Sequence, residues 1–191
     1  MSLGSGLLPS LRQRLPREPE AGELVLVSAR AGVGKSGFLV QLALDALDAG
    51  QRVVHLTLAE GLEDLRRRYT GAEAGQALRD NRLLLQAYPE TKRLDVQRLR
   101  QARTQIWQPV GLDEPNLLLV DGMDWAAESS EVIVELKALA ATCKAVVWAT
   151  ALTHRLPASA PETQRRSYGF ALEHRTRRAA PAPASLARLW Q

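Results

Sequence analysis

The chain has 191 residues, of which 46% are hydrophobic and 24% charged, and its net charge is +4. These values are typical of a folded globular protein, and the length suffices for one domain with a substantial core. No apolar run is long enough to cross a bilayer, and the N-terminus lacks the apolar core of a signal peptide. A single cysteine, Cys143, cannot form an internal disulfide, so we expect a cytoplasmic protein without a membrane anchor.

Three segments follow one another along the chain. Residues 1–20 form a leader interrupted by glycine and proline, in which Leu8, Leu11 and Leu15 share one helical stripe. That stripe packs on the parent domain or on a neighbouring subunit, or else the leader is a loosely ordered end. We expect residues 21–155 to form the core, and residues 156–191 to be a basic segment rich in proline and arginine.

Strands and helices alternate within the core. The expected strands are 23–28, 52–58, 83–87, 116–121 and 145–150. The expected helices are 35–48, 63–69, 93–107 and 131–142. This alternation predicts an α/β fold in which helices cover both faces of a mostly parallel central sheet. Beyond the core, residues 168–172 fit either a short sixth strand or a helical turn, and residues 185–190 fit a helical turn.

The residues that join the first strand to the first helix read SARAGVGKS, at positions 28–36. This is a Walker A pattern, in which backbone N–H groups surround a phosphate at the start of a helix. The residues expected to bind the nucleotide are Arg30, Ala31, Gly32, Val33, Gly34, Lys35 and Ser36. Lys35 would reach the β- and γ-phosphates as a catalytic residue, and the Ser36 hydroxyl would ligate Mg²⁺. Ala29 replaces the usual first glycine, and the alternative is a turn that matches by chance.

Two acidic positions complete the expected site. Asp121 ends an apolar strand, as in a Walker B pattern, and would hold Mg²⁺. The alternative is that Asp121 caps a helix, and Asp124 is a lesser metal candidate. Glu60 follows the second strand at the edge where α/β folds bind ligands, and we expect it to activate the attacking water. The alternative is a surface acid like the nearby Glu63.

The run AGELVLVSARAGVGKS at residues 21–36 resembles the nucleotide-binding core of RecA-type ATPases, above all the DnaB-type helicases and their RadA and KaiC relatives. The resemblance covers roughly residues 20–155 and implies ATP and Mg²⁺ as cofactors, weak ATPase activity and a homo-oligomer. The DnaB-type catalytic glutamate would fall on Ala59, whereas the RadA and KaiC pattern places an acid on Glu60. The glutamine that the family has after its last core strand is Ala151 here, which leaves Thr150 or His154 near the γ-phosphate.

These observations leave three functions open. The first is a RecA-type ATPase in DNA transactions such as recombination, repair or replication, which binds single-stranded DNA through Arg155, Arg165 and Arg166. Only Tyr168 and Phe170 offer nearby stacking surfaces, and a solvated or subunit-facing basic tail is the alternative.

The second possible function is that of a non-motor, nucleotide-dependent regulator or interaction module. The arginines that would then contact a protein partner or a neighbouring subunit's phosphate are Arg175, Arg177 and Arg178. The third possible function is that of a small-molecule kinase, but the sequence has no evident lid or acceptor-binding motif for it.

Overall fold

The central feature of the fold is one six-stranded sheet with the strand order β3-β2-β4-β5-β1-β6. The computed structural model describes residues 19–88, 93–126, 129–152 and 169–172. The strands are β1 (Leu24–Ala29), β2 (Val53–Thr57), β3 (Leu83–Ala87), β4 (Leu117–Asp121), β5 (Val146–Leu152) and β6 (Gly169–Leu172). Every neighbouring pair of these strands is parallel, which confirms the predicted parallel sheet.

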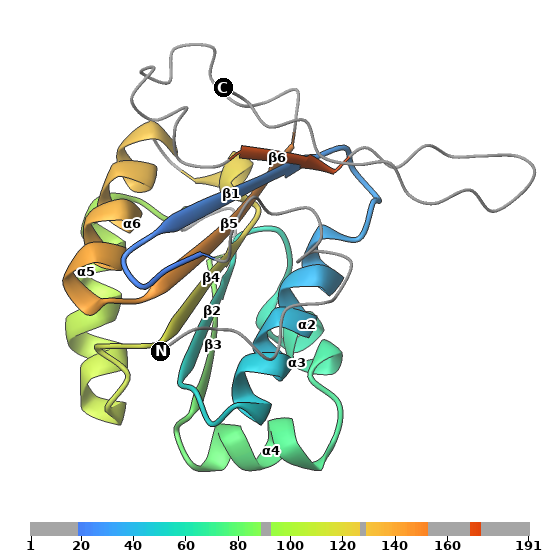
Figure 1. Cartoon of the computed structure of the whole chain (residues 1–191), viewed down its shortest axis with the longest axis vertical. Coiled ribbons are helices and arrows are strands. Elements are labelled where there is room, and N and C mark those ends of the chain that lie inside the picture. The colour runs from blue at the N-terminus through green and yellow to red at the C-terminus, as the bar shows by residue number, and fades with distance from the viewer. Residues whose placement is uncertain (1–18, 89–92, 127–128, 153–168, 173–191) are drawn as a thin grey trace, which may run out of the picture.

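Helices cover both faces of the sheet, as Figure 1 shows. On one face lie α2 (Lys35–Asp48), α3 (Leu62–Arg68) and α4 (Ala72–Arg79). On the other lie α5 (Val96–Ala102) and α6 (Ser129–Cys143). A π-helical turn (Arg103–Trp107) and a 3-10 turn (Gln108–Val110) continue from α5, and a second 3-10 turn (Met123–Trp125) follows β4. Within the described residues, no helix has the length and apolar character needed to cross a bilayer.

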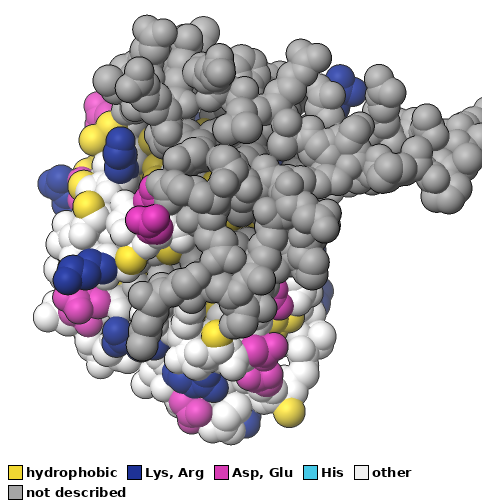
Figure 2. All heavy atoms as spheres, viewed as in Figure 1, with side chains coloured by type: hydrophobic (Ala, Val, Ile, Leu, Met, Phe, Trp, Pro, Cys, Tyr) yellow, Lys and Arg dark blue, Asp and Glu magenta, His cyan; other side chains and the backbone are white. Residues whose placement is uncertain are grey.

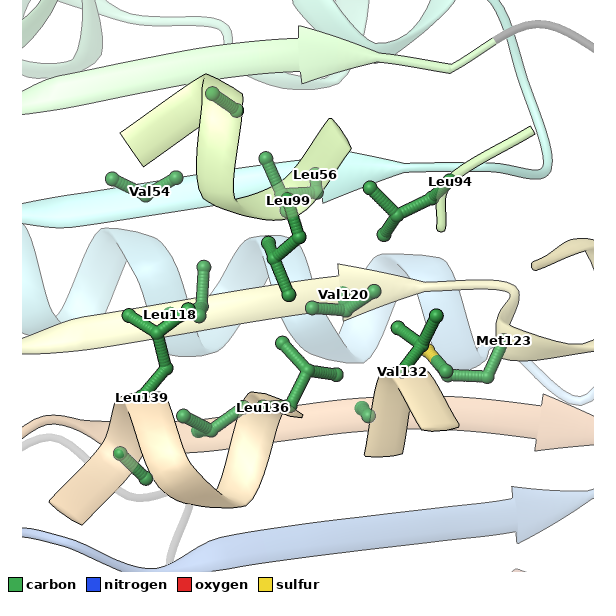
Figure 3. Close-up of a cluster of buried hydrophobic side chains, with 14 of the residues drawn as sticks. Val54, Leu56, Leu94, Leu99, Leu118, Val120, Met123, Val132, Leu136 and Leu139 are labelled. Carbon is green, nitrogen blue, oxygen red and sulfur yellow. The ribbon is translucent and has the colours of Figure 1, made fainter. Parts of the chain in front are cut away.

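Each face of the sheet carries its own hydrophobic core, because alternate residues of a strand point to opposite faces. Figure 3 shows the core beneath α5 and α6, where side chains of β2, β4 and both helices meet. Helix α6 supplies Val132, Leu136 and Leu139 at helical spacing. On the opposite face α2 buries Leu39 and Leu47 against the sheet, and Phe38 meets Trp148 edge to face at 5.6 Å. The two cores hold the sheet rigidly between the helical layers.

The structure differs from the sequence predictions in two helices and decides one open alternative. Helix α4 was not predicted. The predicted helix 93–107 is divided: Asp95 caps α5 by accepting a hydrogen bond from the Arg98 amide at 2.7 Å, and a π-helical turn follows Ala102. Residues 169–172 form a strand parallel to β1, which decides between the two interpretations of that segment. The leader stripe of Leu8, Leu11 and Leu15 and the expected turn at residues 185–190 lie outside the described residues.

Candidate functional site

The predicted site residues meet at one edge of the sheet, because parallel strands bring their carboxyl ends together. The Walker A loop follows β1, Glu60 follows β2, Asp121 ends β4 and Thr150 lies near the end of β5. Strand β5 lies between β1 and β4, so Asp121 is two strands away from the loop. Asp121 is nevertheless close enough for its charge to act on Lys35.

The loop before α2 has two residues in a backbone conformation that favours glycine. Gly32 and Gly34 have φ angles of 76° and 91°, in the left-handed region that glycine adopts without strain. No side chain caps the first turn of α2, and that turn contains no acid. A Cβ built on either glycine would meet no atom of the described residues within 4 Å, and both glycines are exposed. Among the described residues nothing fills the space beside the two glycines, and a helix start of this kind attracts anions.

The remaining loop residues lie around this opening. Arg30 and Ala31 are exposed, whereas Val33 and Ser36 are half-buried, with Ser36 in the first turn of α2. The side chain of Lys35 turns back over the loop, and its Nζ donates hydrogen bonds to the carbonyl oxygens of Ala29 at 3.2 Å and Arg30 at 2.9 Å.

Lys35 is influenced by two carboxylates at the same edge of the sheet. Burial lowers the pKa of Lys35 below its usual value, and the charges of Asp124 and then Asp121 act in the opposite direction. An ammonium that is partly buried and close to acids is suited to exchange its present carbonyl partners for phosphate oxygens.

Asp121 is a buried carboxylate whose two oxygens differ. Its side chain is 2% exposed, and Oδ1 accepts a hydrogen bond from the Thr150 hydroxyl at 2.5 Å. The same hydroxyl accepts from the Gly122 amide at 3.0 Å. Among the described residues, Oδ2 has no hydrogen-bond partner. A carboxylate with one oxygen held and the other free among the described residues suits a hydrated Mg²⁺. The 3-10 turn that follows, Met123–Trp125, receives no side-chain cap from the described residues, so Asp121 does not cap it.

Thr150 lies at the same edge of the sheet, and its hydroxyl contacts the Asp121 carboxylate, whereas its expected place near the γ-phosphate stays a prediction. Its hydroxyl donates a hydrogen bond to Asp121 and accepts one from the Gly122 amide. Ala151 is buried, and His154 lies outside the described residues. The structure thus gives Thr150 the place of a residue that orients Asp121.

The turn after β4 is packed closely against the end of β2. Gly122 has a φ of 85°, and a Cβ added to it would lie 2.9 Å from the Cβ of Ala59. Ala59 is where the resemblance would place the DnaB-type glutamate, and it lies directly beside the turn after Asp121. Asp124 accepts a hydrogen bond from the Leu152 amide at 2.7 Å and so connects this turn to the end of β5.

Glu60 lies at the expected edge but is held by an arginine. The Thr57 hydroxyl accepts hydrogen bonds from the Ala59 and Glu60 amides at 3.3 Å each, and this curls the chain at the end of β2. Arg68 Nε donates to Oε1 and Oε2 of Glu60 at 2.8 and 3.0 Å, and Nη2 donates to Oε2 at 2.8 Å. Both carboxylate oxygens are thus paired within the chain.

A buried histidine lies on the same face of the sheet as Asp121. His55 is fully buried on β2, and its Nδ1 lies 2.6 Å from the hydroxyl of Tyr69. Among the described residues, its Nε2 has no hydrogen-bond partner. Burial lowers the pKa of His55 from 6.5 to about 4, the charge of Asp121 opposes that shift, and the charge of Arg68 adds to it. His55 is therefore neutral in the folded protein near neutral pH.

This shift predicts a loss of stability in mild acid. Between pH 6.5 and about 4 the unfolded chain binds a proton on His55 that the folded chain does not. The free energy of unfolding therefore includes the full contribution of His55 above pH 6.5, and it falls by about 3 kcal/mol as the pH drops to about 4. Urea unfolding at pH 7, 5.5 and 4 should show this decline in the wild type and a flatter one in His55→Gln. Parallel pH profiles for the two proteins would contradict the assignment.

Sequence reasoning missed Thr57, Gly122 and Arg68 as parts of the site. A threonine three residues before Glu60, and a glycine directly after a strand-ending aspartate, are local signals that could have indicated the first two. Arg68 belongs to an arginine triplet on α3, and nothing in the sequence distinguishes it from Arg66 and Arg67.

The described residues contain no cluster of three or more histidine, cysteine, aspartate or glutamate side chains that could hold a metal without a nucleotide. Ser36 and Asp121, with Asp124 as the lesser candidate, stay predictions as metal ligands. Figure 2 shows acidic and basic side chains intermixed over the described part of one face, with no patch of a single sign there. The arginines expected to bind DNA or a partner lie outside the described residues, and Phe170 lies in β6.

Comparison with known proteins supports the fold. No family model and no curated protein matches the sequence. Among solved structures, the KaiC-like protein PH0186 from Pyrococcus horikoshii OT3 matches with a TM-score of 0.66 and 18% identity, over 87% of this chain and 78% of that one. The flagellar accessory protein FlaH from Methanocaldococcus jannaschii matches with a TM-score of 0.62 and 18% identity, over 84% and 75%. The chain therefore has the RecA-like α/β fold that its sequence resemblance predicts.

Proposed function

We propose that this protein binds ATP with Mg²⁺ and hydrolyses it slowly. The observation that supports this most strongly is the open glycine loop at the uncapped start of α2, with the Lys35 ammonium beside it. Backbone amides at a helix start and a flexible ammonium are the groups that hold a triphosphate in P-loop proteins. The likeness in fold to a KaiC-like protein is consistent with the proposal.

Each site residue has a role in this proposal. The amides of residues 32–36 receive phosphate oxygens, and Lys35 leaves the Ala29 and Arg30 carbonyls to contact the β- and γ-phosphates. The Ser36 hydroxyl and the free Oδ2 of Asp121 hold Mg²⁺, which neutralises phosphate charge when bound. Glu60 accepts a proton from the attacking water.

The proposal extends to single-stranded DNA as a partner of the basic C-terminal segment. Arg155, Arg165 and Arg166 follow β5, and clustered arginines favour phosphate backbones without regard to sequence. We expect single-stranded DNA at low salt to bind and to raise the rate of ATP hydrolysis severalfold. Fluorescence anisotropy with a labelled oligonucleotide and a phosphate-release assay measure the two effects. If DNA neither binds at low salt nor changes turnover, the link to DNA is wrong.

The second candidate function is that of a nucleotide-dependent regulator, and the ion pair between Glu60 and Arg68 favours it. Ala59 replaces the DnaB-type glutamate, and Glu60 is paired with Arg68, so hydrolysis would be slow and the ATP-bound state long-lived. A long-lived bound state suits a protein whose partner senses the nucleotide. In that case ATP binds tightly, turnover stays low, and DNA has no effect on it.

A further inference from the structure

Arg68 connects a helix on the α2 face of the sheet to the acid that we assign as the base. It is the last residue of α3, eight positions after Glu60, and its guanidinium faces the Glu60 carboxylate in a forked arrangement. The shortest N–O distance of the ion pair is 2.8 Å, and the Glu60 side chain is 15% exposed whereas that of Arg68 is 43% exposed. The other two ion pairs of α3 have a different geometry. Arg66–Glu63 and Arg67–Asp64 are single contacts between strongly exposed side chains.

The position of Arg68 is fixed by its neighbours on the chain. Leu65, one turn earlier on α3, is fully buried in the core beneath α2. Tyr69, the next residue, is buried and hydrogen-bonded to His55 in the sheet. The backbone around Arg68 is therefore held on both sides, so that the guanidinium is presented to Glu60 by a packed element rather than by a free chain.

The contact also competes with the chemistry that we assign to Glu60. A general base needs an oxygen lone pair directed at the water whose proton it accepts. Because the guanidinium engages both oxygens of Glu60, an attacking water would have to displace it or accept a poorer direction of approach. The hydrogen bond that Arg68 donates to Glu60 is also the largest cause that raises the pKa of Arg68, so the arginine stays charged at any physiological pH.

We propose that Arg68 is a positioning residue that restrains Glu60 in a low-activity arrangement, and that hydrolysis requires this forked pair to open. This inference rests on the proposed ATPase function, because it regulates the same site. In this proposal ATP hydrolysis is slow because of the Glu60–Arg68 ion pair, and not because the site lacks a general base. The proposal also predicts that kcat for ATP hydrolysis rises above the wild-type value when the ion pair is removed.

The test is steady-state ATP hydrolysis at saturating Mg²⁺ and ATP by the full chain. Arg68→Ala should raise kcat by about 5-fold, with an unchanged KM for ATP, because a partly exposed ion pair contributes modestly to the closed arrangement. Arg68→Lys, which keeps the charge but loses the fork, should give an intermediate rise. Arg67→Ala, on the same helix with a side chain 78% exposed, is the matched control and should leave kcat unchanged. Arg68→Ala combined with Glu60→Gln should be as slow as Glu60→Gln alone.

An Arg68→Ala protein that folds normally but has the wild-type kcat, or a lower one, would overturn the proposal. So would a rise in kcat that persists in the double variant, since the gain would then not depend on Glu60. If Arg68→Ala does not fold, Arg68→Lys decides: a rise in kcat supports the restraint, and no rise rejects it. ATP binding measured on the same samples separates the two proposals. Intact binding with an unresponsive kcat overturns the restraint alone, whereas an intact chain that binds no ATP overturns the proposed function itself.

Discussion

Replacing Lys35 with alanine should weaken ATP binding by about 100-fold or more, with little change in stability. The ammonium now donates hydrogen bonds to two carbonyl oxygens of its own loop, at 2.9 and 3.2 Å. With ATP bound, charge-assisted contacts to phosphate oxygens replace these bonds, and losing contacts of that kind costs about 3 kcal/mol of binding free energy. Titration calorimetry with Mg²⁺ and ATP measures the change directly.

The matched control is Lys137→Ala. Lys137 is exposed on α6, which covers the opposite face of the sheet from α2. Its removal changes the net charge by the same amount but should leave ATP affinity unchanged. Equal losses in both variants would mean that overall charge, rather than the loop, attracts the nucleotide. Wild-type affinity in Lys35→Ala would reject the phosphate-loop interpretation.

Replacing Glu60 with glutamine should lower kcat by about 100-fold while ATP affinity stays within about 2-fold of the wild type. Glutamine keeps the size of the side chain and an acceptor oxygen, but it does not accept a proton at neutral pH. We expect the lower end of the usual range for a general base, because Arg68 already restrains Glu60 in the intact chain. Single-turnover hydrolysis separates this chemical step from product release.

The neighbouring acid Glu63 provides the control for that experiment. It lies in the first turn of α3 with a side chain 71% exposed and pairs with Arg66. Glu63→Gln should leave both kcat and ATP affinity unchanged. If Glu60→Gln and Glu63→Gln have the same small effect, Glu60 is a surface acid and another group activates the water.

The backbone of the predicted phosphate loop could be anticipated from the sequence because its determinants are local. Two glycines two positions apart supply the left-handed backbone, and a strand and a helix flank them. Helix α2 begins and ends where the sequence predicts, since Gly34 precedes it and Ala49 and Gly50 follow it. Thr150 and Asp121 were also placed at the right edge, because polar residues that end apolar strands mark the carboxyl side of a parallel sheet.

Other features depend on tertiary contacts that no local pattern encodes. Helix α4 has only eight residues and buries only the small side chains of Ala74 and Ala77, so it lacks the large apolar residues by which a core-facing helix is recognised in a sequence. The place of β5 between β1 and β4 is a matter of topology, which alternation alone does not specify. The Glu60–Arg68 pair depends on the direction in which α3 leaves β2, and the Thr57 hydroxyl that curls this turn acts only once the strand has formed.

The central claim is that the amides of residues 32–36 and the Lys35 ammonium bind a triphosphate. A crystal structure of the full chain with Mg²⁺ and a non-hydrolysable ATP analogue tests this most directly. We predict β- and γ-phosphates at the start of α2, contacts from Lys35 Nζ to them in place of the Ala29 and Arg30 carbonyls, and a metal ion between Ser36 and the Oδ2 side of Asp121. An analogue bound elsewhere, with Lys35 still on its loop carbonyls, would contradict the account.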